Sequence, residues 1–187
     1  MVAEARIVRT EAGLVPAGPG WFVLNASEAR WVDRPGRGRR LPFTGWSDEE
    51  LARFPQLGVN LHVLEPGEPI GMYHWEADAE GFLVLAGEAL LLIEGEERPL
   101  RAWDYVHCPP GAAHMVVGAG AGRSVVLALG AREHQEGADW GAYPVAPAAL
   151  RHGAGVETAT ADPEQAYARF ADPQPTGYRD GWLPGGW

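Results

Sequence analysis

The sequence of 187 residues contains a single cysteine, Cys108, and no apolar run near the ~18 residues that a membrane span needs. A lone cysteine excludes an intramolecular disulfide, so we expect a reducing, cytoplasmic location. The segment from Met1 to Arg6 lacks the apolar stretch of a secretory signal, and we expect none there. These absences predict a protein without a membrane partner.

Positive charge is also scarce. Lys and Arg together number 15 against 25 Asp and Glu, which gives a net charge of −10 and a pI of about 5.0. A nucleic-acid surface requires a basic field, so we expect no nucleic-acid partner. The one basic cluster, which consists of Arg34, Arg37, Arg39 and Arg40, lies among Pro and Gly. We interpret it as a solvated loop, with an anion site as the alternative.

What the chain does contain is an ordinary apolar fraction of 46%, together with 25 Gly and 16 Pro. Such frequent turn signals favour short strands over long helices. The expected strands of the central region are Val59–Glu65, Ile70–Glu76, Gly81–Ala86, Ala89–Glu94, Arg98–Arg101, Tyr105–Cys108, His114–Val117 and Ser124–Leu129. This pattern predicts an all-β barrel or sandwich.

The flanking segments carry weaker signals, and we divide the chain into an arm (1–58), a barrel core (59–130) and an extension (131–187). The arm is expected to contain strands at 5–9 and 21–24, loops at 13–20 and 25–45, and a helix that begins at Ser47 and ends before Pro55. The extension is expected to hold one helix at 162–170, capped by Asp162. Trp182 and Trp187 should dock on the body, since exposed Trp is costly.

The stretch from Gly67 to Gly87 contains side chains that could bind a metal ion. His74 and Glu76 are two residues apart, so on a strand they share a face. A turn after Glu76 would let Glu80 start the next strand beside them. His114 follows the turn signal Pro109-Pro110-Gly111. Two imidazoles and two carboxylates form a mixed set of the kind that binds a divalent transition metal.

These two segments resemble the two signature motifs of the cupins. The first motif places a Gly, a His-x-His pair, a Glu and a final Gly at fixed spacing, as at Gly67, His74, Glu80 and Gly87. The second motif places Pro-x-Gly two residues before a His, as at 109–114. Trp103 replaces the opening Gly of the second motif, and Gly118 replaces its final Asn.

The resemblance implies a double-stranded β-helix, that is, a single jelly-roll barrel with short flanking helices and N- and C-terminal arms. It also implies a homodimer and a metal held by His74, Glu80 and His114. Glu76 stands where the family has its second His. A carboxylate there could coordinate the metal, hold a ligand His from outside the coordination sphere, or act as a general base. The more anionic set favours Zn, Mn or Fe, with Ni as a further candidate.

Apolar residues on the inward-facing parity should line the pocket around the metal. Phe82, Val84 and Val116 are expected there, and Met72 shares the parity of His74. His62 lies on an alternating strand, where we favour a hydrogen-bonded structural histidine and keep entry into the pocket as the alternative.

The sequence therefore predicts a metal-binding cupin that binds or transforms a small organic molecule inside its barrel. One alternative is a non-catalytic module that senses or binds a small molecule. Another is a metal-dependent dioxygenase or a sugar isomerase or epimerase. A fold that hosts many chemistries cannot choose between them.

Overall fold

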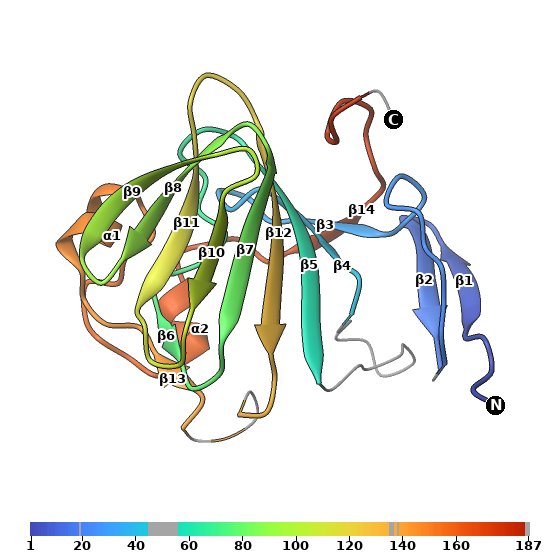
Figure 1. The fold of residues 1–187 in the computed structure, drawn as a ribbon, viewed down its shortest axis with the longest axis horizontal. Coiled ribbons are helices and arrows are strands. Elements are labelled where there is room, and N and C mark those ends of the chain that lie inside the picture. The colour runs from blue at the N-terminus through green and yellow to red at the C-terminus, as the bar shows by residue number, and fades with distance from the viewer. Residues whose placement is uncertain (19, 45–55, 135–136, 138, 186–187) are drawn as a thin grey trace.

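The computed structural model describes residues 1–187 except 19, 45–55, 135–136, 138 and 186–187 (Figure 1). Its main element is a seven-stranded antiparallel sheet. In spatial order its strands are β10 (Tyr105–Cys108), β7 (Glu80–Ala86), β12 (Ser124–Ala131), β5 (Leu57–Leu64), β4 (Arg39–Pro42), β3 (Trp31–Asp33) and β14 (Gln174–Thr176).

A three-stranded sheet faces one end of this large sheet (Figure 1). Its strands, in order, are β11 (His114–Ala119), β8 (Glu88–Ile93) and β9 (Glu96–Arg101). Two smaller pairs complete the strands, β1 (Arg6–Thr10) with β2 (Gly13–Ala17) and β6 (Trp75–Glu76) with β13 (Gly141–Ala142). Two short helices, α1 (Pro147–Arg151) and α2 (Pro163–Tyr167), lie in the C-terminal part of the chain.

The main core lies between the two sheets. Phe82 and Val84 from β7, Val126 from β12 and Val116 from β11 all belong to one buried cluster. These apolar residues alternate along their strands, so each strand turns one face to this interior. The predicted all-β jelly roll with short flanking helices is confirmed.

The arm segment differs from its predicted local structure. Residues 21–24 form no strand; Trp21 makes only a single bridge to Glu4, and Val23 is 81% exposed. Conversely, β2 lies in a predicted loop, and β3 and β4 lie in a region expected to be irregular. Arg39 and Arg40 open β4, and charged residues hide a strand from a search for apolar runs. The predicted helix from Ser47 lies outside the described residues.

Strands from both flanking segments extend the main sheet beyond the core. β3 and β4 come from the first 58 residues, and β14 comes from the extension and pairs with β3. The extension contains α1, which was not predicted, and α2, which begins one residue after Asp162 as expected. The division into arm, core and extension stays a prediction.

The C-terminal tail packs on the large sheet. Trp182 is 6% exposed, and its ring centroid lies 5.3 Å from that of Trp31 in an edge-on arrangement. Trp187 lies outside the described residues. Within the described part of the chain, no helix combines the length and the apolar character needed to cross a membrane.

Candidate metal centre

Three donor side chains converge at one end of the barrel interior. The Nε2 atom of His114 lies 2.9 Å from Oε2 of Glu80, and Nε2 of His74 lies 3.5 Å from the same oxygen. Each of the three residues offers a ligand atom within 4.8 Å of the other two. His114 is 2% exposed at its side chain and His74 12%, so both imidazoles are enclosed by protein.

The backbone brings the two histidines together. His74 N donates to His114 O at 3.2 Å, and His114 N donates to His74 O at 2.8 Å. The turn before His114 is tied to the same strand pair, because Gly111 N donates to Glu76 O at 2.7 Å. Gly111 itself has a φ of 83°, a left-handed conformation that glycine adopts without strain. The Pro-Pro-Gly turn thus sets where His114 begins β11.

Both rings are held in one orientation by carbonyl groups. The Nδ1 atom of His74 lies 2.8 Å from Met72 O, and Nδ1 of His114 lies 2.8 Å from Ala112 O. A carbonyl oxygen can only accept, so Nδ1 carries the hydrogen in each ring. In the neutral form, each Nε2 then presents its lone pair toward Glu80. Hydrogen bonds of this kind are typical behind metal-ligating histidines.

The protonation equilibria reflect this clustering. Burial lowers the pKa of His74, but hydrogen bonds to Glu76 and Glu80 outweigh burial and raise it well above its usual value. For His114, burial also lowers the pKa, and the bonds to Cys108 and Glu80 raise it overall to about 9. Burial raises the pKa of Glu80, yet its two histidine partners bring it down to about 2. Glu80 is therefore a carboxylate at neutral pH, as a ligand must be.

Glu76 has a different place from the other three. Its Oε1 lies 3.0 Å from Nε2 of His74, and its side chain is 28% exposed. It does not join the group of mutually close donors formed by His74, Glu80 and His114. Glu76 thus lies on the open side of the cluster, next to one imidazole.

The residues expected to line the pocket fall into separate groups. The ring of Phe82 lies 5.4 Å from that of His114, and Val84 and Val116 are fully buried in the core behind it. Met72, 1% exposed, packs instead with Tyr143 and residues of the extension. Residues 71–74 form no continuous strand, so the parity argument does not apply to Met72.

His62 on β5 is almost enclosed, with 3% of its surface exposed. Its Nδ1 accepts from Nη2 of Arg34 at 3.0 Å. Burial, then the charges of Arg34 and Arg40, lower its pKa well below the usual value. His62 is therefore a neutral, hydrogen-bonded histidine on the strand. Contact of a substrate with His62, Phe82, Val84, Val116 and Met72 stays a prediction.

Two aromatic residues beside the site were missed from the sequence. The ring centroids of Tyr143 and Trp140 lie 5.8 Å and 6.4 Å from that of His74. Burial, followed by the proximity of Tyr167 and Glu76, raises the pKa of Tyr143, so its hydroxyl stays protonated. Both residues flank β13, a strand of two residues that no sequence pattern announces.

A second group of donors, Asp78, Glu133 and His134, also lies within 4.8 Å of one another. Glu133 and His134 are exposed, and Asp78 already pairs with His134 at 2.7 Å. This group is a surface ion pair with a neighbouring carboxylate, and it lacks the enclosed, preset geometry of the first.

The donor set of the first cluster fits a divalent metal ion. Two imidazole nitrogens and one carboxylate oxygen face a common point, and their orienting hydrogen bonds are in place. The fold and the site together define a jelly-roll barrel protein with a histidine–carboxylate cluster that could hold such an ion.

Comparison with known proteins agrees with this class. The sequence profile of the Cupin domain family matches residues 60–130. The barrel core of the chain is therefore a cupin domain. No curated protein matches the chain.

Several solved structures are similar over about half of the chain. A Cupin 2 conserved barrel domain protein from Salinispora arenicola is 27% identical over 49% of this chain and 73% of its own, with a TM-score of 0.41. A sugar phosphate isomerase from a cupin superfamily, from Silicibacter pomeroyi, is 27% identical over 50% and 59%, with a TM-score of 0.42. DMSP lyase DddQ from Ruegeria pomeroyi is 25% identical over 55% and 50%, with a TM-score of 0.44. The chain spans less than two thirds of the isomerase and of the lyase.

Proposed function

We propose that this cupin binds one divalent transition metal, Zn, Mn or Fe before Ni, through His74, Glu80 and His114, and transforms a small organic molecule there. The observation that carries the proposal is the shared focus of two Nε2 atoms and Oε2 of Glu80, with both ring tautomers already set. Enclosed histidines that face a carboxylate need either extra protons or a metal cation between them, and a cation satisfies all three donors at once.

A bound ion would polarise a substrate carbonyl or lower the pKa of a water molecule. Glu76, on the open side of the cluster, is in place either to complete the ligand set or to accept a proton as a general base. The protonated hydroxyl of Tyr143 can donate a hydrogen bond to a substrate oxygen. Phe82, Val84 and Val116 exclude water from the inner side of the site.

Metal analysis of the purified protein tests this proposal. We expect close to one equivalent of metal per chain, loss of that metal on chelation, and a rise in melting temperature when it is restored. His74→Ala, Glu80→Gln and His114→Ala should each lower the metal content severalfold. The control His107→Ala changes an exposed histidine of β10 and should keep the full content. Metal content unchanged in all three ligand variants would refute the proposed centre.

A panel of small organic molecules then separates catalysis from sensing. Metal-dependent turnover of any compound supports an enzyme. Metal-dependent binding without turnover across carbonyl compounds, sugars and organic acids supports the alternative, a module that binds or senses a small molecule. Oxygen consumption that requires iron would identify the dioxygenase alternative, and interconversion of sugars the isomerase alternative.

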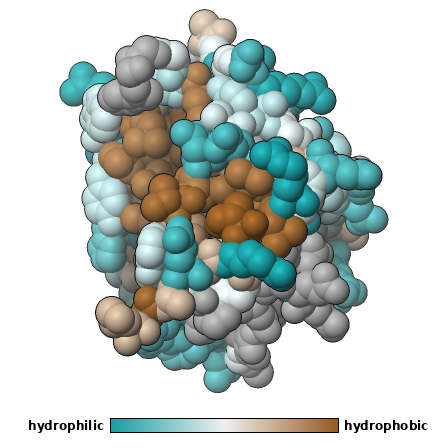
Figure 2. All heavy atoms as spheres, turned by 90° about the vertical axis from the view of Figure 1, so that its right-hand side faces the viewer, coloured by the Kyte–Doolittle hydropathy of each residue, from teal (hydrophilic) through white to brown (hydrophobic). Residues whose placement is uncertain are grey.

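We further propose that the protein works as a cytoplasmic homodimer. Figure 2 shows apolar side chains gathered on the face at the β1–β2 end of the molecule. The apolar cluster that includes Val15 of β2 is buried, and the partly buried Val8, Phe43 and Leu127 pack against it. Apolar side chains gathered on a surface commonly mark subunit contacts. Light scattering in solution tests the dimer, and a monomer at micromolar concentration would contradict it.

A further inference from the structure

Two arginines near the barrel interior are buried and a third is partly buried, in contrast to the solvated loop expected from the sequence. Arg34 is 4% exposed and Arg37 is 8% exposed. Arg40 is partly buried on β4. We call Arg34, Arg37 and Arg40 the arginine cluster. Enclosing several positive charges together is unfavourable unless an anion or a carboxylate compensates them.

One member of the arginine cluster is locked by protein groups. Arg34 donates through Nη1 to Ile70 O at 2.8 Å and through Nη2 to Arg37 O at 2.7 Å. Its Nη2 also donates to Nδ1 of His62 at 3.0 Å. Arg34 thereby fixes the loop from which Arg37 projects, and it is a structural member of the cluster.

The other two members lack such partners. Within the ranges that the structure describes, the guanidinium groups of Arg37 and Arg40 make no hydrogen bond and no ion pair with a carboxylate. Their Nε atoms are buried and unpaired, while the Arg40 residue as a whole is partly exposed. Arg37 instead lies over aromatic rings, with its guanidinium carbon 4.6 Å from the centroid of Tyr167 and 4.8 Å from that of Phe170.

Both burial and mutual repulsion disfavour the charged form of these arginines. Burial is the largest cause that lowers the pKa of Arg34 and that of Arg40. The charges of Arg40 and then Arg37 follow for Arg34, and the charge of Arg37 follows for Arg40. Among the described residues, Glu68 is the one carboxylate that raises the pKa of Arg34, and it is the weakest of the causes. In a chain of net charge −10, enclosed cations that make no ion pair with a carboxylate of the described residues are a specific local feature.

The register places Arg40 on the inward face of the large sheet. Arg40 lies opposite His62, His62 opposite Val126, and Val126 opposite Val84. Residues directly opposite each other in a sheet share a face. Val126 and Val84 belong to the barrel core, so Arg40 faces the same interior.

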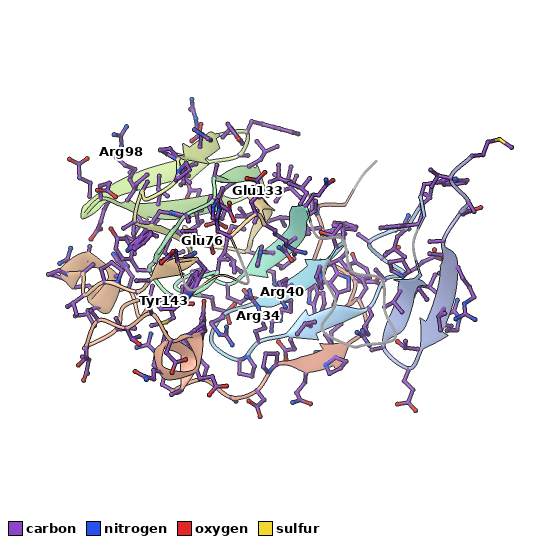
Figure 3. All side chains as sticks on the ribbon, turned by 90° about the horizontal axis from the view of Figure 1, so that it is seen from below. Arg34, Arg40, Glu76, Arg98, Glu133 and Tyr143 are labelled. Carbon is purple, nitrogen blue, oxygen red and sulfur yellow. The ribbon has the colours of Figure 1, made fainter. Side chains whose placement is uncertain are left out.

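A chain of aromatic contacts connects the arginine cluster to the metal centre. The ring of Tyr143 lies 5.8 Å from that of His74 and 5.9 Å from that of Tyr167, over which Arg37 lies. Glu76 and Arg37 both influence the pKa of Tyr143, so it stands between the two groups. In Figure 3, Arg34, Arg40, Glu76 and Tyr143 lie around the inner part of the barrel, whereas Arg98 points outward.

We propose that Arg37 and Arg40 bind the anionic group of the substrate, which is therefore a small organic acid or phosphate ester. This inference rests on the proposed function, because it assumes that the other end of the molecule reaches the metal centre. Arginine's planar set of donors suits both carboxylate and phosphate oxygens. The rings of Tyr167 and Phe170 hold Arg37 in place, so little side-chain freedom is lost on binding.

Ligand binding by calorimetry tests the inference with inorganic phosphate, succinate, glucose 6-phosphate and neutral glucose as probes. Sodium chloride at equal ionic strength controls for general screening. We expect saturable binding of at least one anionic probe and none of glucose. Comparing the binding of phosphate and glucose 6-phosphate with that of succinate shows whether the site prefers a phosphate group or a carboxylate. The inference would be overturned if glucose and all the anions gave the same binding signal. It would also be overturned if no anionic probe gave more signal than sodium chloride.

Variants locate the binding site. Arg37→Met and Arg40→Met approximate the side-chain length and remove the charge. Each should lower the affinity for the anionic probe at least tenfold. Arg98→Met, on the exposed strand β9, is the matched control and should bind like the wild type. Because the two cluster variants remove uncompensated buried charge, their melting temperatures without ligand should not fall. Wild-type affinity in both variants would overturn the assignment.

Metal content, measured on the same samples, separates this inference from the proposed function. If the protein contains metal but binds no anionic probe, the metal centre is supported and the anion site is refuted. Anion binding that depends on Arg40 in a protein without metal refutes the metal centre and retains the anion site. Both variants should keep the metal content of the wild type, since neither arginine contacts a ligand residue among the described contacts.

Discussion

Gly141 lies directly against Trp75, where β13 pairs with β6. A Cβ atom at position 141 would stand 2.1 Å from Trp75 O, a distance that no side chain tolerates. The absence of a side chain at this position lets the extension approach the strand that carries Glu76. Tyr143, two residues further on, thereby reaches the rim of the metal centre.

Gly141→Ala should therefore push β13 away from β6 and move Tyr143. We expect a loss of about 1–3 kcal/mol in the free energy of unfolding, because the clash is with backbone. Substrate or anion binding should weaken, while His74, Glu80 and His114 keep the metal. The matched control is Gly122→Ala, since nothing lies within 4 Å of a Cβ atom there. Urea denaturation of the two variants checks the difference, and equal stability would contradict it.

His62 should make stability fall in acid. Its pKa in the folded protein lies well below that of the unfolded chain, about 6.5, because of burial and the facing charges of Arg34 and Arg40. The unfolded state then binds the proton more readily, so this contribution is complete above pH ~6.5 and decreases as the pH falls. His62→Asn retains an acceptor for Arg34 and should flatten stability between pH 7 and 5.

His134 provides a contrast of opposite sign. Its hydrogen bond to Asp78 raises the pKa of His134 above that of the unfolded chain. The stabilisation is therefore present at low pH and is lost as the pH rises through the folded-state pKa. His134→Asn should remove this effect and so steepen the fall toward acid. Urea midpoints measured across pH distinguish the two variants, and identical slopes would refute both assignments.

Trp182 should anchor the C-terminal tail. Its ring packs edge-on against Trp31 and is 6% exposed, so Trp182→Ala should cost about 3–5 kcal/mol if the tail unfolds with the sheet. Trp21→Ala is the control, because Trp21 is 52% exposed and should cost less than about 1 kcal/mol. Thermal unfolding compares them. A similar loss in both would mean that the docked tail contributes nothing specific.

Asp162 should stabilise α2 as its N-cap. Its Oδ1 accepts from Glu164 N at 2.9 Å, and α2 carries Tyr167, the neighbour of Arg37. Asp162→Ala should cost about 1 kcal/mol, whereas Asp162→Asn keeps an acceptor and should cost only a few tenths. Hydrogen exchange of the α2 amides reads out the local effect. Equal protection in both variants would argue against the cap.

The barrel strands were predictable because their apolar residues face a core over several consecutive positions. β7, β8 and β12 carry such runs between turn signals, and the structure places them where the sequence predicted. The N-cap of α2 was equally predictable, from Asp162 followed by Pro163. β4 was not, because it opens with two arginines, and its pairing with β5 depends on tertiary contact.

The candidate site was predictable only where a motif fixes the spacing. His74, Glu80 and His114 follow such a pattern, and the structure brings all three together. Tyr143 could not be found, since it depends on a strand pair of two residues each, formed far along the chain. The burial of Arg37 could not be predicted either, because it depends on packing against Tyr167, which is distant in the sequence.

The pairing of β14 with β3 has a consequence for synthesis. Residues 174–176 hydrogen-bond with residues 31–33, so the edge of β3 stays open until the ribosome has released that late segment. A nascent chain, or a product stopped early in translation, exposes an unpaired strand that invites association with another polypeptide. Once residues 174–176 pair, the edge of β3 is covered and β14 becomes the outer strand of the sheet.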